Sequence, residues 1–199
     1  MEDNLALLTD RSLSGHGRFT RMFRTAGLND FAGAARHVWR LPYGRITNRT
    51  EFWRVLTEGR GTCTTKHALL AELAREQQIE VQLILGIFQM NERNTPGVGQ
   101  VLERYGLTFI PEAHCYLTYM GKRIDVTGVP EGAEPIETFL HEEPITIEQI
   151  GAYKIDLHKR FLEGWIATGP GQGRSLEEVW RIREECIAAL SAGPTDSGV

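Results

Sequence analysis

The chain has 199 residues, of which 41% are hydrophobic, 24% charged and 9% aromatic. This composition is typical of globular proteins, and a chain of this length buries a core that needs no disulfide. The most apolar stretch, Ile79 to Met90, is interrupted by Glu80, Gln82 and Gln89, which excludes a membrane-spanning helix. Three cysteines are an odd number, and no basic or apolar leader follows the start of the chain. We therefore expect a reducing compartment, a cytoplasmic location and no membrane partner.

The net charge of −4 is too small to indicate a partner, although its distribution is uneven. Residues 1–50 carry eight Arg and four acidic residues, whereas the rest of the chain is acidic. These Arg residues form no run of five or more and accompany no nucleic-acid motif. We therefore expect them on a solvated face and expect no nucleic-acid partner.

The first two thirds of the chain mix helical and strand patterns. Apolar periodicity and turn residues predict these elements in order: a loosely patterned segment over 1–28, a helix capped by Asn29 or Asp30 that runs to Arg40 before Pro42, a short helix capped by Thr50, a helix from Cys63 to about Gln77, a buried strand over Glu80–Met90, a loop over 91–100, a short helical piece over 101–105, and a hairpin of 109–120 and 122–127 that turns at Gly121.

The final third is predicted to be helical. Thr146 is expected to cap a helix that reaches Trp165, and a Gly-rich linker follows over 169–173. Ser175 and Glu178 form a capping-box pattern that opens a last helix. We expect an α+β fold with one domain over 1–190, a core at about 50–128, a helical part at about 146–190, and a disordered tail over 191–199.

Cys63 is the first residue that points to chemistry. It follows the turn Gly59-Arg60-Gly61-Thr62 and opens the predicted helix, with Thr62 as the expected N-cap. The exposed N–H groups and the dipole at a helix start favour a thiolate, and the two glycines leave backbone open to a substrate. The other interpretation is a small buried apolar residue, a common role for cysteine.

His114 and Asp125 are placed together by the parity of the hairpin. If Met120 and Gly121 form a two-residue turn, His114 and Asp125 lie on one face, on a diagonal that long side chains can span. A thiol nucleophile needs a base and a group that orients that base, so Cys63, His114 and Asp125 are the candidate catalytic residues. A loop of three or five residues would reverse the parity.

The other two cysteines and a metal site are the alternatives to this interpretation. Cys115 is expected on the apolar face of the hairpin, and Cys186 on the apolar stripe of the last helix, both as core residues. Cys63 and His67 have the i, i+4 spacing of metal ligands, but His114 and Cys115 face opposite sides of a strand. We therefore expect no metal and no cofactor, and a capping or surface role for His67.

The segment Gly59-Arg60-Gly61-Thr62-Cys63-Thr64-Thr65-Lys66-His67-Ala68-Leu69-Leu70, followed by His114 and by Arg123-Ile124-Asp125-Val126-Thr127, resembles the core of the transglutaminase-like superfamily. The resemblance covers residues 50 to 128. It implies a papain-like α+β core in which the Cys helix packs on an antiparallel sheet, with extra C-terminal helices in this chain.

The resemblance also implies roles for three residues: Cys63 as nucleophile, His114 as base and Asp125 as the residue that orients the base. We therefore expect a thiol enzyme, a hydrolase or transferase, that acts on a peptide or amide-containing substrate. Trp53 and Asn48 are candidates for the second oxyanion donor. The alternative is an inactive binding or structural module that keeps the fold.

Overall fold

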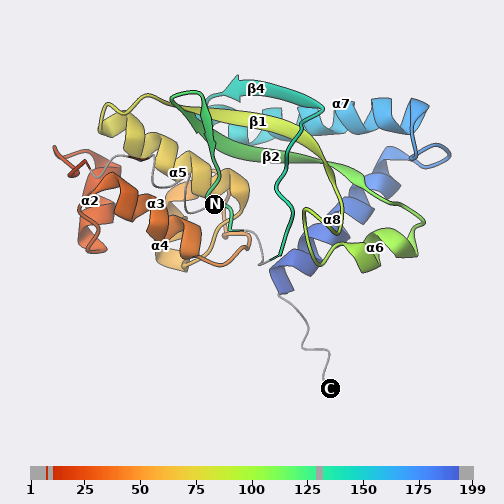
Figure 1. Cartoon of the computed structure of the whole chain (residues 1–199), viewed down its shortest axis with the longest axis horizontal. Coiled ribbons are helices and arrows are strands. Elements are labelled where there is room, and N and C mark those ends of the chain that lie inside the picture. Colours follow the sequence, from red (N-terminus) through yellow and green to blue (C-terminus); the bar gives the residue numbers. More distant parts are fainter. Residues whose placement is uncertain (1–7, 9–10, 129–131, 193–199) are drawn as a thin grey trace, which may run out of the picture. The chain divides into compact units, whose positions relative to one another are not determined.

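A computed structural model describes residues 8, 11–128 and 132–192 of the chain (Figure 1). It is an α+β structure, as the sequence predicted. Its elements, in chain order, are α2 (Arg18–Thr25), α3 (Phe31–Arg40), η1 (Phe52–Arg54), α4 (Val55–Glu58), α5 (Cys63–Glu76), β1 (Val81–Met90), α6 (Gly99–Arg104), β2 (Ile110–Tyr119), β3 (Lys122–Ile124), β4 (His141–Ile145), η2 (Ile147–Ile150), α7 (Ala152–Thr168) and α8 (Leu176–Ala192).

The four described strands form one antiparallel sheet in the order β3-β2-β1-β4. The sequence predicted β1 and the β2–β3 hairpin, but it gave no indication of β4. Apolar and polar residues do not alternate in β4, and Ile145 is the one buried residue of its five. The edge strand was therefore missed because its pairing partner lies some 50 residues earlier in the chain.

Contacts divide the chain into two units. The first contains Met1–Leu85, His114–Gly128 and Glu143–Gly151, and the second contains Gly86–Ala113, Val129–Glu142 and Ala152–Val199. In the first unit, α2, α3 and α4 pack against α5 (Figure 1). In the second unit, α8 packs against α6 and α7. The expected single domain over 1–190 stays a prediction.

Helix α5 begins at Cys63, where the sequence placed it, and Thr62 is its N-cap. The hydroxyl of Thr65 accepts a hydrogen bond from the Thr62 N–H at 3.1 Å, which fixes the backbone just before the helix. Eleven of its residues are buried, including all of the first two turns. This helix is therefore the centre of the first unit, and its polar first turn is inside the protein.

Helix α2 lies inside the segment that was expected to be loosely patterned. Its first turn is capped by Glu76, whose carboxylate accepts hydrogen bonds from the N–H groups of Phe19 at 3.0 Å and Thr20 at 2.7 Å and from the Thr20 hydroxyl at 2.7 Å. At Gly17, a β-carbon would lie 2.2 Å from this carboxyl group. The cap comes from the last turn of α5. Because no capping side chain stands next to α2 in the sequence, the local pattern did not predict this helix.

The β2–β3 hairpin has the predicted register. Tyr119 pairs with Lys122, and the turn residues Met120 and Gly121 both have positive φ angles, 50° and 73°, as a two-residue type I′ turn requires. The ladder ends at Ile124, three residues before the predicted end of the strand. Asp125 therefore follows the strand rather than lying within it.

Several predicted ends need correction. Glu51, not Thr50, precedes the short helical segment η1. The helix expected from Thr146 to Trp165 is interrupted at Gly151, where the single turn η2 gives way to α7. Ser175 accepts from the N–H of Glu178 at 3.2 Å and opens α8 as expected. That helix includes Ser191 and Ala192, and the rest of the expected disordered tail lies outside the described residues.

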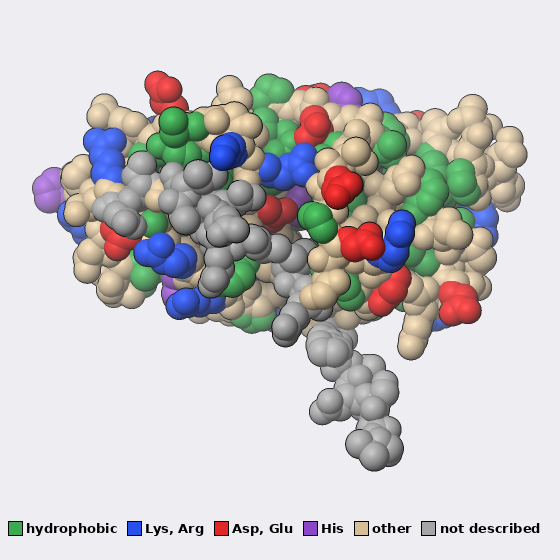
Figure 2. Space-filling view, viewed as in Figure 1, with side chains coloured by type: hydrophobic (Ala, Val, Ile, Leu, Met, Phe, Trp, Pro, Cys, Tyr) green, Lys and Arg blue, Asp and Glu red, His purple; other side chains and the backbone are tan. Residues whose placement is uncertain are grey.

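None of the helices in the described part of the chain is both long and apolar enough to cross a bilayer. On the face drawn in Figure 2, basic and acidic side chains occur side by side. The charge in this view is mixed rather than gathered into one sign.

Removal of the Glu76 cap from α2 is expected to destabilise the protein. Glu76→Gln replaces one acceptor oxygen by an NH₂ group that faces backbone donors, so we expect a loss of about 1–3 kcal/mol in the free energy of unfolding. Denaturant unfolding at pH 7 measures it. Glu80→Gln, at an exposed position, is the matched control and is expected to change stability by less than about 0.5 kcal/mol. Equal stabilities of the two variants would contradict the cap.

Candidate active site

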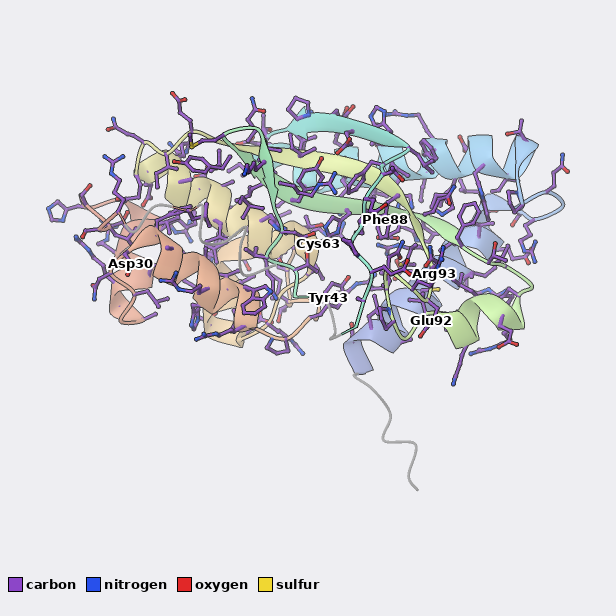
Figure 3. All side chains as sticks on the ribbon, in the orientation of Figure 1. Asp30, Tyr43, Cys63, Phe88, Glu92 and Arg93 are labelled. Atoms are coloured by element: carbon purple, nitrogen blue, oxygen red, sulfur yellow. The ribbon has the colours of Figure 1, made fainter. Side chains whose placement is uncertain are left out.

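The turn before Cys63 is held against the segment after α3. Gly61 forms an isolated parallel bridge with Tyr43, and its N–H donates to the Pro42 carbonyl at 3.2 Å. Figure 3 shows Tyr43 and Cys63 close together in the view. A β-carbon on Gly61 would lie 2.8 Å from Lys66 Cγ, so only glycine fits this approach. The Cys63 residue is 7% exposed at the start of α5.

His114 and Asp125 are in direct contact. His114 Nε2 lies 2.6 Å from Asp125 Oδ2, and the His114 side chain is 8% exposed. The other carboxylate oxygen, Oδ1, accepts from the Thr127 N–H at 2.8 Å, which holds the carboxylate in an Asx turn just after β3. The hairpin parity therefore placed these two side chains correctly, although Asp125 lies beyond the ladder.

Cys63 is the second partner of the His114 ring, and the two side chains are hydrogen-bonded. Because Nε2 faces Asp125 at 2.6 Å, Nδ1 is the ring nitrogen that is left for the sulfur. Burial disfavours the charged ring, but the charges of Asp125 and Cys63 and the hydrogen bonds to both raise the pKa of His114 to about 10. The arrangement therefore favours the charged imidazolium form of His114 at neutral pH.

Asp125 stays ionised in this arrangement. Its side chain is 25% exposed. Burial alone would raise the pKa of the carboxyl group, but the charge and hydrogen bond of His114 hold that pKa well below its usual range. The carboxylate can therefore orient the imidazolium without taking its proton.

His67 is fully buried and bonds to backbone on both sides. Its Nδ1 donates to the Cys63 carbonyl, 2.7 Å away, and its Nε2 accepts from the Val126 N–H at 2.8 Å. These two bonds require the neutral Nδ1–H tautomer. Burial lowers the pKa of His67 to about 4 despite the nearby charge of Asp125. The expected surface or capping role is wrong: His67 joins the first turn of α5 to the segment after β3.

Lys66 is also fully buried. Its Nζ donates to three backbone carbonyls, those of Leu41 at 2.5 Å, Thr127 at 2.8 Å and Trp39 at 3.5 Å. Burial lowers the pKa of this ammonium to about 8, and the charges of Asp125 and Cys63 oppose that shift. The sequence signal for Lys66 and His67 is their position, since two titratable residues stand about one helical turn after Cys63.

Cys115 and Cys186 are both fully buried, as expected. Burial, with the charges of Glu112 and Glu185, raises the pKa of Cys186 to about 12. All three cysteines are described, and none forms a disulfide. Among the described residues no three His, Cys, Asp or Glu side chains form a group suited to a metal ion, and both nitrogens of His67 already bond to backbone.

The two candidates for a second oxyanion donor have contacts of their own. The Asn48 side-chain oxygen accepts from the N–H of Thr50 at 3.1 Å and from its hydroxyl at 2.8 Å. The Arg18 guanidinium lies over the Trp53 ring, with its Cζ atom 3.9 Å from the ring centre. Neither of these contacts involves Cys63.

Comparisons with protein-family models, with curated proteins and with solved structures gave no match to this chain. Three side chains from three places in the sequence form one hydrogen-bonded series, and two buried neighbours, Lys66 and His67, tie the backbone around it.

The neutral state of His67 predicts a pH dependence. Its pKa is about 4 in the folded protein and about 6.5 when unfolded, so the unfolded state binds more protons between these values and stability falls on acidification. His67→Gln removes this contribution. We expect the wild type to lose about 2 kcal/mol more than His67→Gln between pH 7.5 and 5.

Denaturant unfolding of both proteins at the two pH values measures this difference, because the other titrating groups are common to both. His16→Gln, at an exposed histidine, is the control and is expected to keep the wild-type dependence. Parallel pH profiles of the wild type and His67→Gln would show that His67 is not held neutral.

Proposed function

We propose that this protein is a cysteine-dependent enzyme that transfers the acyl group of an amide or peptide-like bond. Cys63 is the nucleophile, His114 the general acid and base, and Asp125 the residue that orients His114. The observation that carries the proposal is the contact of 2.6 Å between His114 Nε2 and Asp125 Oδ2, on a ring whose other partner is the Cys63 thiol.

The proposed reaction has two balanced steps. The Cys63 thiolate attacks the acyl carbonyl, so that an Sγ–C bond forms, the C–N bond breaks and the His114 proton passes to the leaving amine. In the second step, His114 takes a proton from water as the water oxygen attacks the thioester. The carboxylic acid is released, and the thiolate and imidazolium are restored. An amine in place of water gives transfer rather than hydrolysis.

The oxyanion of both steps needs a hydrogen-bond donor near the sulfur. Cys63 is the first residue of α5, and the N–H of a first helical residue has no acceptor inside its own helix. This N–H lies at the positive end of the helix dipole, where a developing oxyanion is stabilised. The preceding turn at Gly61 is held by backbone bonds, so this donor is positioned before a substrate arrives.

We also infer a transglutaminase-like, papain-like core. Support comes from the order of the three residues, with Cys63 at a helix start and His114 on the strand next to the one that leads to Asp125. The antiparallel sheet agrees with this inference. A peptide or amide-containing substrate and a cytoplasmic location belong to the same proposal, the second because all three cysteines are thiols.

The proposal predicts that Cys63 reacts first among the three thiols. Iodoacetamide at pH 6, followed by mass spectrometry of peptides, is expected to label Cys63 well ahead of Cys115 and Cys186, because the charged His114 ring favours the Cys63 thiolate, whereas the other two thiols are fully buried. The control is the same protein unfolded in denaturant, where the three rates are expected to converge. Equal or slower labelling of Cys63 in the folded protein would contradict its role as nucleophile.

The ion pair predicts an order of pH profiles for Cys63 alkylation. Asp125→Asn keeps the shape of the side chain but removes the charge that stabilises the imidazolium, so labelling is expected to require higher pH. His114→Ala removes the cation and is expected to shift the profile further. If the pH profile of Cys63 alkylation shifts in His114→Ala but not in Asp125→Asn, Asp125 is not the residue that orients His114.

Acyl transfer itself is tested with p-nitrophenyl acetate. We expect a burst of p-nitrophenol and an acetyl group on Cys63, detected by mass, that hydroxylamine removes faster than water does. Cys63→Ala is the control and is expected to show no burst. A wild type that behaves like Cys63→Ala would leave the chain as an inactive module of the same fold.

A further inference from the structure

The first turn of α5 contains a cation that the proposed reaction does not use. Lys66 lies three residues after Cys63, is fully buried, and reaches two separate parts of the backbone. Trp39 lies in the last turn of α3 and Leu41 is the C-cap of that helix, whereas Thr127 lies two residues after Asp125. A buried lysine is uncommon, and its three backbone contacts indicate a specific role.

Three carbonyl acceptors match the three donors of a charged ammonium. A neutral amine would leave a lone pair facing a carbonyl oxygen, so the cage itself favours the cation. The cage is also tight. At Gly128, where φ is +76°, a β-carbon would lie 3.0 Å from the Trp39 carbonyl oxygen and 3.7 Å from Lys66 Nζ. The chain after Thr127 therefore approaches α3 closely around this charge.

The charge of Lys66 acts on the anions of the site. The titratable groups that interact with it are Asp125 and Cys63, whose negative charges favour the ammonium, and His67, whose charged form it disfavours. Electrostatic coupling is reciprocal. Each anion that stabilises the ammonium is therefore stabilised by the ammonium to the same extent. Lys66 thus supplements His114 as a positive neighbour of Cys63.

We propose that Lys66 is a positioning residue of the Cys63 site, whose caged ammonium stabilises the Cys63 thiolate and fixes the segment that carries Asp125. This proposal rests on the proposed function, because it assigns Lys66 a part in forming the nucleophile. The cation differs from His114 in one respect: it transfers no proton. It is held on backbone carbonyls and keeps its charge while the imidazole cycles between its two states.

The first test is the pH profile of Cys63 alkylation in Lys66→Met. Methionine fills a similar volume without charge, and we expect the profile to move upward by about one pH unit, with slower labelling at pH 6. Lys66→Arg restores the charge and is expected to recover part of the shift. The matched control is Lys154→Met, at a buried lysine of the other unit whose charge acts on Glu112 and His158.

The second test avoids a variant at Lys66. The ¹³Cε resonance of Lys66 in protein labelled with [¹³C]lysine is expected to titrate near pH 8 in the wild type. If the coupling is as proposed, the midpoint moves to lower pH in Cys63→Ser and in Asp125→Asn, because each removes a negative neighbour. This measurement decides the proposal if Lys66→Met does not fold.

The outcomes separate the two proposals. Fast labelling of wild-type Cys63 at pH 6 with an unchanged profile in folded Lys66→Met would overturn the role of Lys66 and leave the proposed function intact. Slow labelling of wild-type Cys63 would contradict the proposed function. A Lys66 titration that is the same in the wild type, Cys63→Ser and Asp125→Asn would overturn the coupling whatever Cys63 does.

Discussion

Burial of the first turn of α5 obliges each polar group on it to find a partner inside the protein, since an unpartnered buried polar group is strongly unfavourable. The thiol of Cys63 meets His114, the ammonium of Lys66 meets three carbonyls, and the ring of His67 meets a carbonyl and an N–H group. Apart from the Cys63 carbonyl, these partners lie at the end of α3, on β2 and after β3. The same bonds that satisfy the helix start thereby bring together the segments that form the site.

Three buried histidines show how partners, rather than burial, determine which ring can act as a base. His158 bonds the Pro111 carbonyl at 2.8 Å, and burial lowers its pKa even though Glu112 is nearby. His67 bonds backbone on both sides and is neutral. His114 alone of these three rings lies between a carboxylate and a thiol, and its pKa is raised. At His114, two anionic neighbours outweigh the desolvation of the charged ring, whereas at His67 and His158 one nearby carboxylate does not.

Much of the fold could be predicted from the sequence, because local patterns specify local geometry. The caps Asp30 and Thr62, the helices that they open and the two-residue turn at Gly121 depend on residues within a few positions of one another. The parity of that turn also placed His114 and Asp125 on one side of the hairpin. By contrast, α2 depends on Glu76 and β4 on β1, and these partners lie some 50 to 60 residues away in the chain.

The candidate site also has some features that depend on neighbouring residues and others that depend on residues far away in the chain. The sequence by itself determined the position of Cys63 at a helix start and the pairing of an imidazole with a carboxylate, since both follow from short-range backbone geometry. Only the tertiary structure decided that His67 is neutral and that Lys66 is caged. Their partners, Val126, Leu41 and Thr127, come from 25 to 61 residues away. The protonation state of a buried group depends on the atoms that surround it after folding, and no pattern along the chain specifies those atoms.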